Sequence, residues 1–339
     1  MTIGLPTFNS ESYLDACVES IAAQTYDDFQ VLVVDGGSTD STPERLERWR
    51  ARDERVDIHP RPVVGLYQAF NTILSASKTR YVCIHPADDI VSPEFLKQMS
   101  QTLDTHPGAA AAISRLRVFD EQGQQEASPH FGLCWPSSAP VHRWPFDAMT
   151  GLLRENPYVS LTQILFRAQA IEKIRFRTDL GSTADILFHL TLALRHDIVH
   201  VDSTWGGWRI HPHQASQNNS DQNVKRRNLE LMLDLAFGEH LRRIDDQGYR
   251  SKLQYIIDVM GTYQALAQRV SGRSHLSRWA TVLGTAVRSP KAAYLYAMSR
   301  TLRREAEREW LTRQAQMLTD DRVERQIEQS VDASSDDQE

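Results

Sequence analysis

The first hundred residues alternate short apolar runs with segments of helical periodicity, and this alternation restricts the fold more than any other feature. Short apolar runs bounded by turn residues are typical of buried strands, and apolar residues recurring every three or four positions are typical of helices. A chain that alternates the two builds βαβ units and a mainly parallel sheet. The strands expected here are Thr2–Pro6, Val31–Val34, Val56–His59 and Tyr81–His85.

Helices are expected between these strands and again further along the chain. The first carries Leu14, Cys17, Val18 and Ile21 at helical spacing, with Ser10 or Ser12 as its N-cap. After about residue 105 the pattern loosens into a mixed region, which contains one more expected strand. The other expected elements are a helix with Leu46 and Trp49, a helix at Gly65–Ser77, a strand at Leu161–Phe166, and helices at Glu172–Leu180 and Ala184–Arg195 around a turn at Gly181.

The length of 339 residues favours two unequal parts over one core. We expect a main domain over 1–220, with halves at 1–105 and 106–220, and a helical region over 221–315. The segment 316–339 is acidic and poor in apolar residues, so disorder is expected there. A net charge of -6 and a pI near 6.1 disfavour a general nucleic-acid binder.

Three cysteines, Cys17, Cys83 and Cys134, show no metal-type spacing and are expected as free thiols in a reducing compartment. The chain begins directly with an expected strand, and no secretory signal is visible. No apolar run approaches the roughly 18 to 20 residues that span a bilayer. These features predict a cytoplasmic protein, with peripheral contact at the inner face of the plasma membrane as the alternative.

Carboxylates follow two of the expected strands. Asp35 opens a turn-rich segment after the second strand, and the adjacent Asp88 and Asp89 follow the fourth. The carboxyl ends of parallel strands are where open α/β sheets bind ligands. Adjacent carboxylates suit a hard divalent cation, Mn²⁺ or Mg²⁺, which keeps waters and substrate phosphates in its shell. The alternative is that Asp88 or Asp89 caps the helix that starts near Pro93.

Four segments, in this order and spacing, resemble glycosyltransferase family 2, a group of inverting enzymes with the GT-A fold. They are Pro6-Thr7-Phe8-Asn9, then Val33 to Asp40, then Gly65 to Asn71, and then Ala87-Asp88-Asp89. The resemblance covers roughly residues 1 to 215. It implies an α/β fold of the GT-A, nucleotide-diphospho-sugar-binding type, in which a mostly parallel central sheet is flanked by helices, and an α-helical C-terminal region follows.

The resemblance also implies roles for individual residues. Pro6, Thr7, Asn9 and Asp35 would line the nucleoside pocket in the half 1–105, and Asp88 would approach the ribose. Asp89 would bind a divalent cation that bridges the donor diphosphate. Gly36 stands where many relatives carry an acidic residue that contacts the base, and Pro86 stands where the metal motif usually begins with aspartate.

Asp185 matches the acidic residue that serves the family as catalytic base just before a helix, in the acceptor-side half 106–220. An inverting displacement needs a group that deprotonates the acceptor hydroxyl. The alternative is that Asp185 only complements the dipole of its helix.

Trp208, Arg209 and His211 resemble the family's Arg-x-His segment. Arg209 could bind phosphate oxygens, and His211 could contact a metal or phosphate. A structural role is the alternative for both. Tryptophans, Trp205 and Trp208 among them, could stack on sugars or belong to the core.

The segment from Arg269 to Arg313 has ten basic side chains and interleaved aromatic residues. Such helices can lie on an anionic membrane surface or pack on the main domain. The predicted activity is transfer of a sugar, with inversion, from a UDP-sugar or related nucleotide donor to a saccharide or lipid-linked saccharide in surface polysaccharide or glycolipid assembly. The alternatives are a sugar nucleotidyltransferase, which should carry a Gly-rich phosphate loop after its first strand, and a non-catalytic nucleotide-sugar-binding protein.

Overall fold

The computed structural model describes residues 1–60, 62–122, 141–142, 160–212 and 214, with single positions at 231, 235, 238 and 247. The chain divides into two compact units, one of Met1–Gly151 with Glu155–Gln247 and one of Leu152–Arg154 with Gly248–Glu339. All described residues belong to the first unit. The expected boundaries at 220 and 315, the basic segment 269–313, the acidic tail and Cys134 lie outside them.

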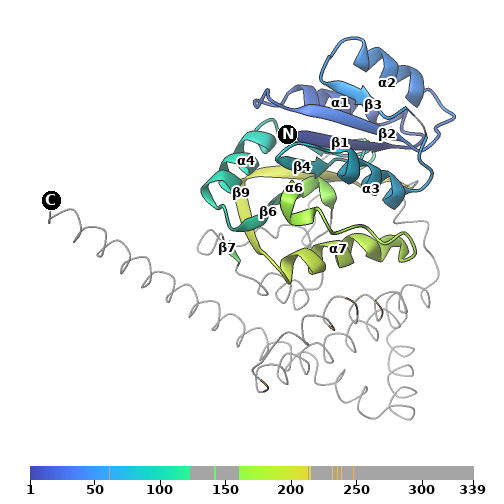
Figure 1. Ribbon diagram of the computed structural model, residues 1–339. Coiled ribbons are helices and arrows are strands. Elements are labelled where there is room, and N and C mark those ends of the chain that lie inside the picture. The colour runs from blue at the N-terminus through green and yellow to red at the C-terminus, as the bar shows by residue number, and fades with distance from the viewer. Residues whose placement is uncertain are drawn as a thin grey trace, which may run out of the picture. The chain divides into compact units, whose positions relative to one another are not determined.

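The four strands expected in the first hundred residues form the parallel part of the sheet (Figure 1). β1 lies between β2 and β4 and runs parallel to both, and β3 continues the sheet beyond β2. Their carboxyl ends therefore reach one edge, where Thr7 pairs in register with Asp35. The bounds are β1 Thr2–Thr7, β2 Gln30–Asp35, β3 Val56–Ile58 and β4 Tyr81–Ile84.

Helices cover both faces of this parallel part. α1 (Leu14–Ala22), α2 (Thr42–Arg50) and α4 (Phe95–Thr105) share one buried core with Ile3 and Leu5 of β1. Side chains alternate along a strand, so Gly4, which lies between these two residues, faces the other side.

On that other side lies α3 (Leu66–Ala76), which approaches β1 closely. A Cβ at Gly4 would lie 2.1 Å from Cγ2 of Ile73. Glycine at this position therefore lets the helix pack directly on the strand. The α3 helix begins just after Gly65, whose φ of 100° is one that few other residues adopt.

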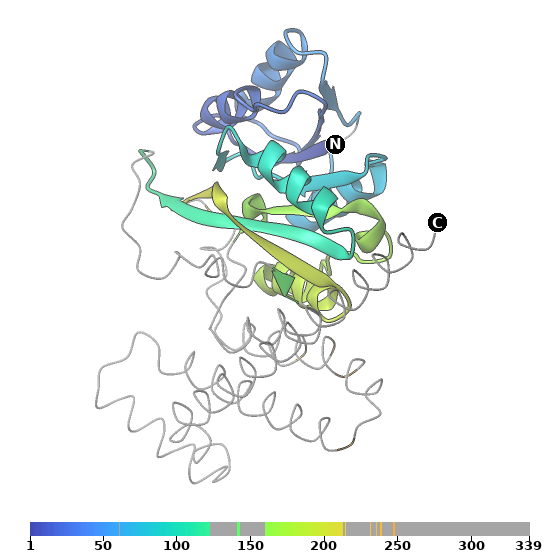
Figure 2. The ribbon, with the colours of Figure 1, turned by 90° about the vertical axis from the view of Figure 1, so that its left-hand side faces the viewer.

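The second part of the sheet combines parallel and antiparallel pairs. The strand order is β3-β2-β1-β4-β8-β6-β9-β5, with β7 paired to β9. β8 runs antiparallel to β4 and β6, whereas the long β6 and β9 are parallel neighbours (Figure 2). The expected parallel half is confirmed, and the whole sheet is mixed. The bounds are β5 Ile90–Val91, β6 Ala109–Phe119, β7 Val141–His142, β8 Ile164–Arg167 and β9 Asp197–Arg209.

Short helical elements surround these strands. They are η1 (Leu161–Gln163), α6 (Ala168–Ile171), η2 (Gly181–Thr183) and α7 (Ala184–Ala193). α7 confirms the expected helix and follows Gly181, whose φ is 52°. The expected helix at Glu172–Leu180 is wrong. There the chain turns at Ile171, and the amide and carbonyl of Phe176 bond the side chain of Asn71 instead of a helical partner.

The expected N-cap of α1 by Ser10 or Ser12 is also wrong, because Tyr13 holds the cap position without a side-chain cap bond. Ser10 contributes its carbonyl, which accepts from the amides of Tyr13 and Leu14. Cys17 and Cys83 are buried free thiols, as expected.

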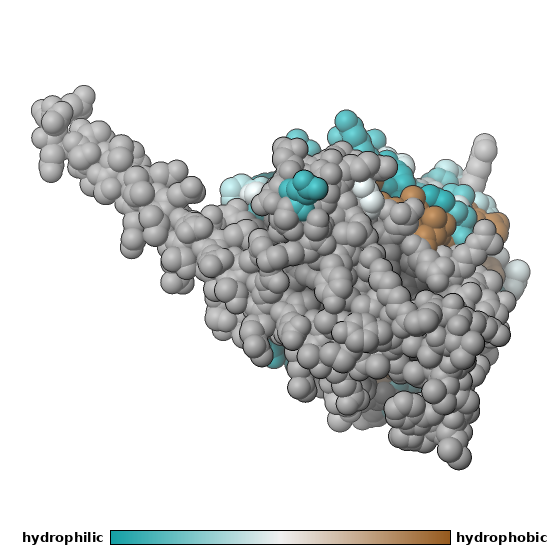
Figure 3. Space-filling view, turned by 90° about the horizontal axis from the view of Figure 1, so that it is seen from below, coloured by the Kyte–Doolittle hydropathy of each residue, from teal (hydrophilic) through white to brown (hydrophobic). Residues whose placement is uncertain are grey.

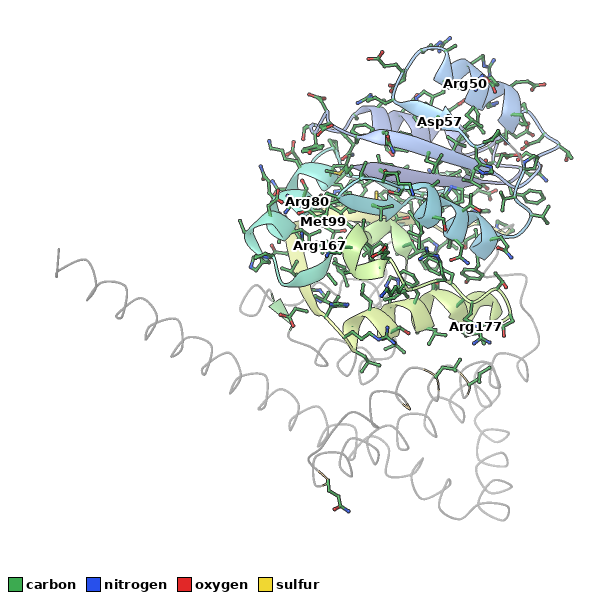
Figure 4. All side chains as sticks on the ribbon, in the orientation of Figure 1. Arg50, Asp57, Arg80, Met99, Arg167 and Arg177 are labelled. Atoms are coloured by element: carbon green, nitrogen blue, oxygen red, sulfur yellow. The ribbon has the colours of Figure 1, made fainter. Side chains whose placement is uncertain are left out.

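Away from the carboxyl-terminal edge, Arg167 of β8 joins three elements (Figure 4). Its guanidinium donates to the carbonyls of Ala109 in β6 at 3.0 Å and Leu103 in α4 at 2.8 Å.

Within the described residues, no helix is long and apolar enough to cross a membrane. The coloured part of the face in Figure 3 is mainly hydrophilic, with a small hydrophobic area.

Candidate active site

Asp35 at the end of β2 anchors the loop that follows it. Its carboxylate accepts hydrogen bonds from the hydroxyls of Thr7 at 2.8 Å and Ser38 at 2.6 Å. It also accepts from the amides of Gly37 at 2.9 Å and Ser38 at 2.8 Å. Asp35 therefore fixes the backbone of its own loop against the end of β1.

Asn9 ties the loop after β1 to the same segment. The backbone amide of Asn9 donates to Oγ of Ser38 at 2.8 Å, and its side-chain Oδ1 accepts from the backbone amide of Thr39 at 2.9 Å. Asn9 adopts a φ of 47°, which asparagine tolerates better than most residues. Thr7, Asn9 and Asp35 thus form one cross-linked pair of loops, whereas Pro6 is buried within β1.

Phe8 is held between these bonded residues with 63% of its surface exposed. A Cβ at Gly36 would lie 3.1 Å from the Phe8 ring, so the missing side chain of Gly36 leaves room for the ring. An exposed aromatic ring at the carboxyl ends of the parallel strands can stack on a flat ring such as a nucleobase. Phe8 belongs to the Pro6–Asn9 segment that the resemblance places at the nucleoside pocket, and its exposure singles it out within that segment.

Asp88 meets His211, which follows the end of β9. His211 Nε2 lies 3.0 Å from Oδ2 of Asp88, whose side chain is 29% exposed. The ring of Tyr13, just before α1, lies 4.5 Å from the imidazole. Nδ1 of His211 is buried and has no hydrogen-bond partner within the described part of the chain. The chain thus brings together two predicted site residues separated by more than a hundred positions.

Asp89 is buried, with 2% of its surface exposed. One carboxylate oxygen accepts from the hydroxyls of Thr162 and Ser160, the latter at 3.2 Å, and the other accepts from the amide of Arg209 at 3.0 Å. Burial raises the pKa of Asp89 well above its usual range, and the nearby charge of Asp88 adds to this effect. The hydrogen bonds to Thr162, Ser160 and Arg209 thus occupy both carboxylate oxygens of Asp89.

Neither carboxylate caps α4. The cap position of that helix is held by Glu94 without a side-chain cap bond, and the side chain of Gln24 bonds the amide of Leu96. The capping alternative for Asp88 and Asp89 is excluded. Ser160 and Thr162, which hold Asp89, were not identified from the sequence, because only the fold places them beside it.

Arg209 has a structural environment. Its Nε donates to the carbonyl of Asp88 at 2.9 Å, and its NH1 lies 3.3 Å from the carbonyls of Asp120 and Glu121. The residue is 6% exposed, and its guanidinium lies 5.4 Å from the centre of the Tyr13 ring. These contacts hold the strand ends together and leave little of the guanidinium open to a phosphate.

Asp185 lies in the first turn of α7. Within the described residues, its carboxylate accepts one hydrogen bond, from the amide of Ile186 at 2.8 Å. The residue is partly exposed. Burial raises its pKa to about 6, against the opposing effect of nearby backbone amides. A carboxylate with such a pKa is suited to accept a proton near neutral pH.

The site can be tested for a divalent cation on its donor atoms. No cluster of three or more His, Cys, Asp or Glu side chains suited to a metal occurs within the described ranges. Oδ2 of Asp88 and Nε2 of His211 lie 3.0 Å apart, at hydrogen-bond distance, and both atoms are suitable metal ligands. They fit a cation whose other positions are filled by donor phosphates and water. Asp89 fits less well, because its oxygens are already bonded.

Comparisons with known proteins identify the family of this chain. The family model described as Glycosyl transferase family 2 matches residues 2–175. An uncharacterized glycosyltransferase of Haemophilus influenzae is 26% identical over 67% of this chain and 72% of its own length.

Two solved structures share the fold. Staphylococcus aureus TarS 1–349, in complex with UDP-GlcNAc, matches 80% of this chain and 73% of its own, with a TM-score of 0.57 and 19% identity. The mannosyltransferase PcManGT of Pyrobaculum calidifontis, in complex with GDP-Man and Mn²⁺, matches 91% of this chain and 86% of its own, with a TM-score of 0.51 and 16% identity. These likenesses confirm the expected fold class.

Proposed function

Because the chain belongs to glycosyl transferase family 2 and is a glycosyltransferase, we propose that it transfers a sugar from a UDP-sugar to an acceptor hydroxyl with inversion. The observation that carries this proposal is the Asp185 carboxylate at the start of α7, whose raised pKa suits a general base. The acceptor is a saccharide or lipid-linked saccharide in surface polysaccharide or glycolipid assembly.

The donor nucleoside binds at the loops after β1 and β2. Thr7, Asn9 and Asp35 hold these loops in place through their mutual bonds. The exposed ring of Phe8 stacks on the base, and the missing side chain of Gly36 leaves space for the Phe8 ring. The UDP-GlcNAc complex of TarS supports a uridine donor.

Asp88 and His211 hold the donor diphosphate end of the site. If a divalent cation binds there, these two residues are its protein ligands. Asp89 keeps the neighbouring Asp88 in position through its own bonds to Thr162 and the Arg209 amide. A bound cation would neutralise negative charge on the departing diphosphate. The Mn²⁺ in the PcManGT complex supports manganese as the first cation to test. This assignment replaces the sequence-based expectation that Asp89 is the ligand.

Asp185 takes the proton of the acceptor hydroxyl as that oxygen attacks the anomeric carbon. A new carbon–oxygen bond forms, the bond from the anomeric carbon to the diphosphate breaks, and the nucleoside diphosphate leaves with the electron pair. Attack from the face opposite the leaving group inverts the configuration. Because Asp185 must be ionised to act, turnover should rise as pH increases through about 6.

The test uses the full chain. Thermal melting is measured with UDP and with GDP, each with and without Mn²⁺, and UDP release is then measured from UDP-GlcNAc. We expect UDP with Mn²⁺ to give the largest rise in melting temperature, because a ligand of the native state stabilises it. Asp88→Asn should lose the Mn²⁺-dependent part of this rise. Asp57→Asn, on the exposed side of β3, is the matched control and should keep it.

A result in which neither nucleotide raises the melting temperature and no nucleotide is released would overturn the proposal. Binding without release under all conditions tried would favour a non-catalytic nucleotide-sugar-binding protein.

A further inference from the structure

Tyr67 and Asp185 occupy matching positions in two helices. Tyr67 lies in the first turn of α3, and Asp185 lies in the first turn of α7. α3 follows β3 and begins at the carboxyl-terminal edge of the parallel strands, because a helix after a parallel strand starts where that strand ends. Tyr67 therefore stands at the edge that carries the donor loops.

Phe176 braces these two helix starts against each other. Its ring stacks on Phe188 of α7 with centroids 4.1 Å apart and an angle of 5°. It also packs against Tyr67 at 5.9 Å and Phe70 at 5.2 Å, both in α3. Offset and edge contacts of this kind stabilise aromatic pairs and fix their geometry.

Asn71 holds the backbone of Phe176 in this position. Its Nδ2 donates to the carbonyl of Phe176, and its Oδ1 accepts from the amide of the same residue, both at 2.9 Å. The two bonds satisfy both polar groups of one residue from a single side chain. The Tyr67 ring is thus set relative to α7 by an ordered chain of contacts.

Within the described residues, the polar ends of this pair make few hydrogen bonds. The Tyr67 hydroxyl has no hydrogen-bond partner within the described residues, and the Asp185 carboxylate accepts only from its neighbouring amide there. Burial raises the pKa of Tyr67, and the Asp185 charge raises it further, so the two groups interact electrostatically without a bond between them. The phenol therefore remains a hydrogen-bond donor at neutral pH.

We propose that Tyr67 is an acceptor-binding residue, which donates a hydrogen bond to a second oxygen of the acceptor saccharide beside the hydroxyl that Asp185 deprotonates. The inference rests on the proposed function of Asp185. It assigns the acceptor class: a sugar ring with two neighbouring oxygens, one for each side chain. Water as acceptor offers no second oxygen and does not use Tyr67.

The first arm of the test needs no acceptor. The full chain is labelled at the tyrosine Cζ carbon with ¹³C, and the Tyr67 signal is identified by its loss in Tyr67→Phe. Its chemical shift should titrate with a midpoint near 6, and Asp185→Asn should abolish that step. A Tyr67 signal that is constant between pH 5 and pH 8, or that titrates unchanged in Asp185→Asn, would overturn the juxtaposition.

The second arm compares acceptors. UDP release from UDP-GlcNAc is measured with water alone and with the methyl glycosides of glucose, galactose, mannose and N-acetylglucosamine. Tyr67→Phe keeps the ring and its stacking, so UDP affinity and hydrolysis should match wild type. Transfer to a glycoside should fall by about 2- to 10-fold in kcat/KM, the effect of one hydrogen bond. Tyr26→Phe, a partly buried tyrosine elsewhere in the chain, is the control.

Equal loss of hydrolysis and transfer in Tyr67→Phe would assign the residue a structural role and overturn the inference, as would full transfer activity. Failure of wild type to bind UDP or release it would instead overturn the proposed function, and the Tyr67 titration would still decide whether the two side chains face each other.

Discussion

Asp89→Ala is expected to destabilise the fold, because the Asp89 carboxylate joins three segments of the main domain. The substitution removes three hydrogen bonds, from the Thr162 hydroxyl, the Ser160 hydroxyl and the Arg209 amide. The two hydroxyls keep their 3.3 Å contact with each other, and the buried amide loses its acceptor. An unsatisfied buried donor costs about 1 to 3 kcal/mol. Part of this is recovered because the costly burial of a carboxylate is removed, so we expect a net loss of about 2 to 4 kcal/mol.

Asp89→Asn should behave differently. Its amide oxygen can still accept from the Arg209 amide, and its NH₂ group can donate to hydroxyls that rotate to accept. Burial raises the folded pKa of Asp89 above the unfolded value of about 3.9, so the ionised carboxylate reduces stability increasingly as pH rises above that value. Asparagine lacks this penalty, and the stability of Asp89→Asn relative to wild type should therefore improve from pH 4 to pH 8.

The assay is thermal unfolding followed by circular dichroism. For a domain of this size, each kcal/mol shifts the midpoint by roughly 2 to 4 °C, so Asp89→Ala should melt about 4 to 16 °C below wild type. Asp57→Ala, at an exposed position of β3, is the matched comparison and should shift the midpoint little. Equal midpoints for Asp89→Ala and wild type would refute the structural role given to Asp89.

Three further predictions concern packing, pH and the C-terminal segment. Gly4→Ala should lose about 1 to 3 kcal/mol of stability, because the added Cβ overpacks against Ile73. The double variant Gly4→Ala/Ile73→Ala should lose less stability than the sum of the two single variants, and additive losses would contradict this explanation. Burial lowers the pKa of His85 to about 4, below its unfolded value of about 6.5, so stability should fall by up to about 3 kcal/mol as pH drops through this range. A smaller acid loss in His85→Gln would support that origin, and an identical loss would exclude it. If the basic segment 269–313 binds membranes, the full chain should sediment with anionic liposomes at low salt and be released at high salt, and truncation before residue 270 should abolish binding; equal sedimentation of both forms would contradict it.

The parallel half of the sheet could be predicted from the sequence because its signals are local. Strands such as Val31–Val34 are continuous apolar runs, and the helices between them keep their periodicity. β6 and β9 could not be predicted in the same way. β6 begins with four alanines and β9 contains Gly206-Gly207, and both compositions are unusual for strands. These strands form because neighbouring strands provide their partners.

The site residues likewise divide into those with a local sequence signal and those placed by distant contacts. Asp35, Asp88 and Asp185 could be singled out because each follows a strand or opens a helix. Which carboxylate of the Asp88-Asp89 pair faces the ligand depends on Thr162 and Ser160, more than seventy residues away. The position of Tyr67 depends on Phe176, in a segment where a helix was expected. Such distant contacts leave no local pattern in the chain.

The catalytic role of Asp185 is tested most directly by Asp185→Asn, which is nearly isosteric but cannot take the acceptor's proton. We predict that the dissociation constant for UDP with Mn²⁺, measured by calorimetry, stays near wild type, while turnover of UDP-GlcNAc falls by about 10²- to 10⁴-fold. If Asp185 only complements the dipole of α7, the substitution should instead cost roughly 0.3 to 1 kcal/mol of stability and leave turnover unchanged. A folded Asp185→Asn protein with wild-type turnover would contradict the proposed mechanism.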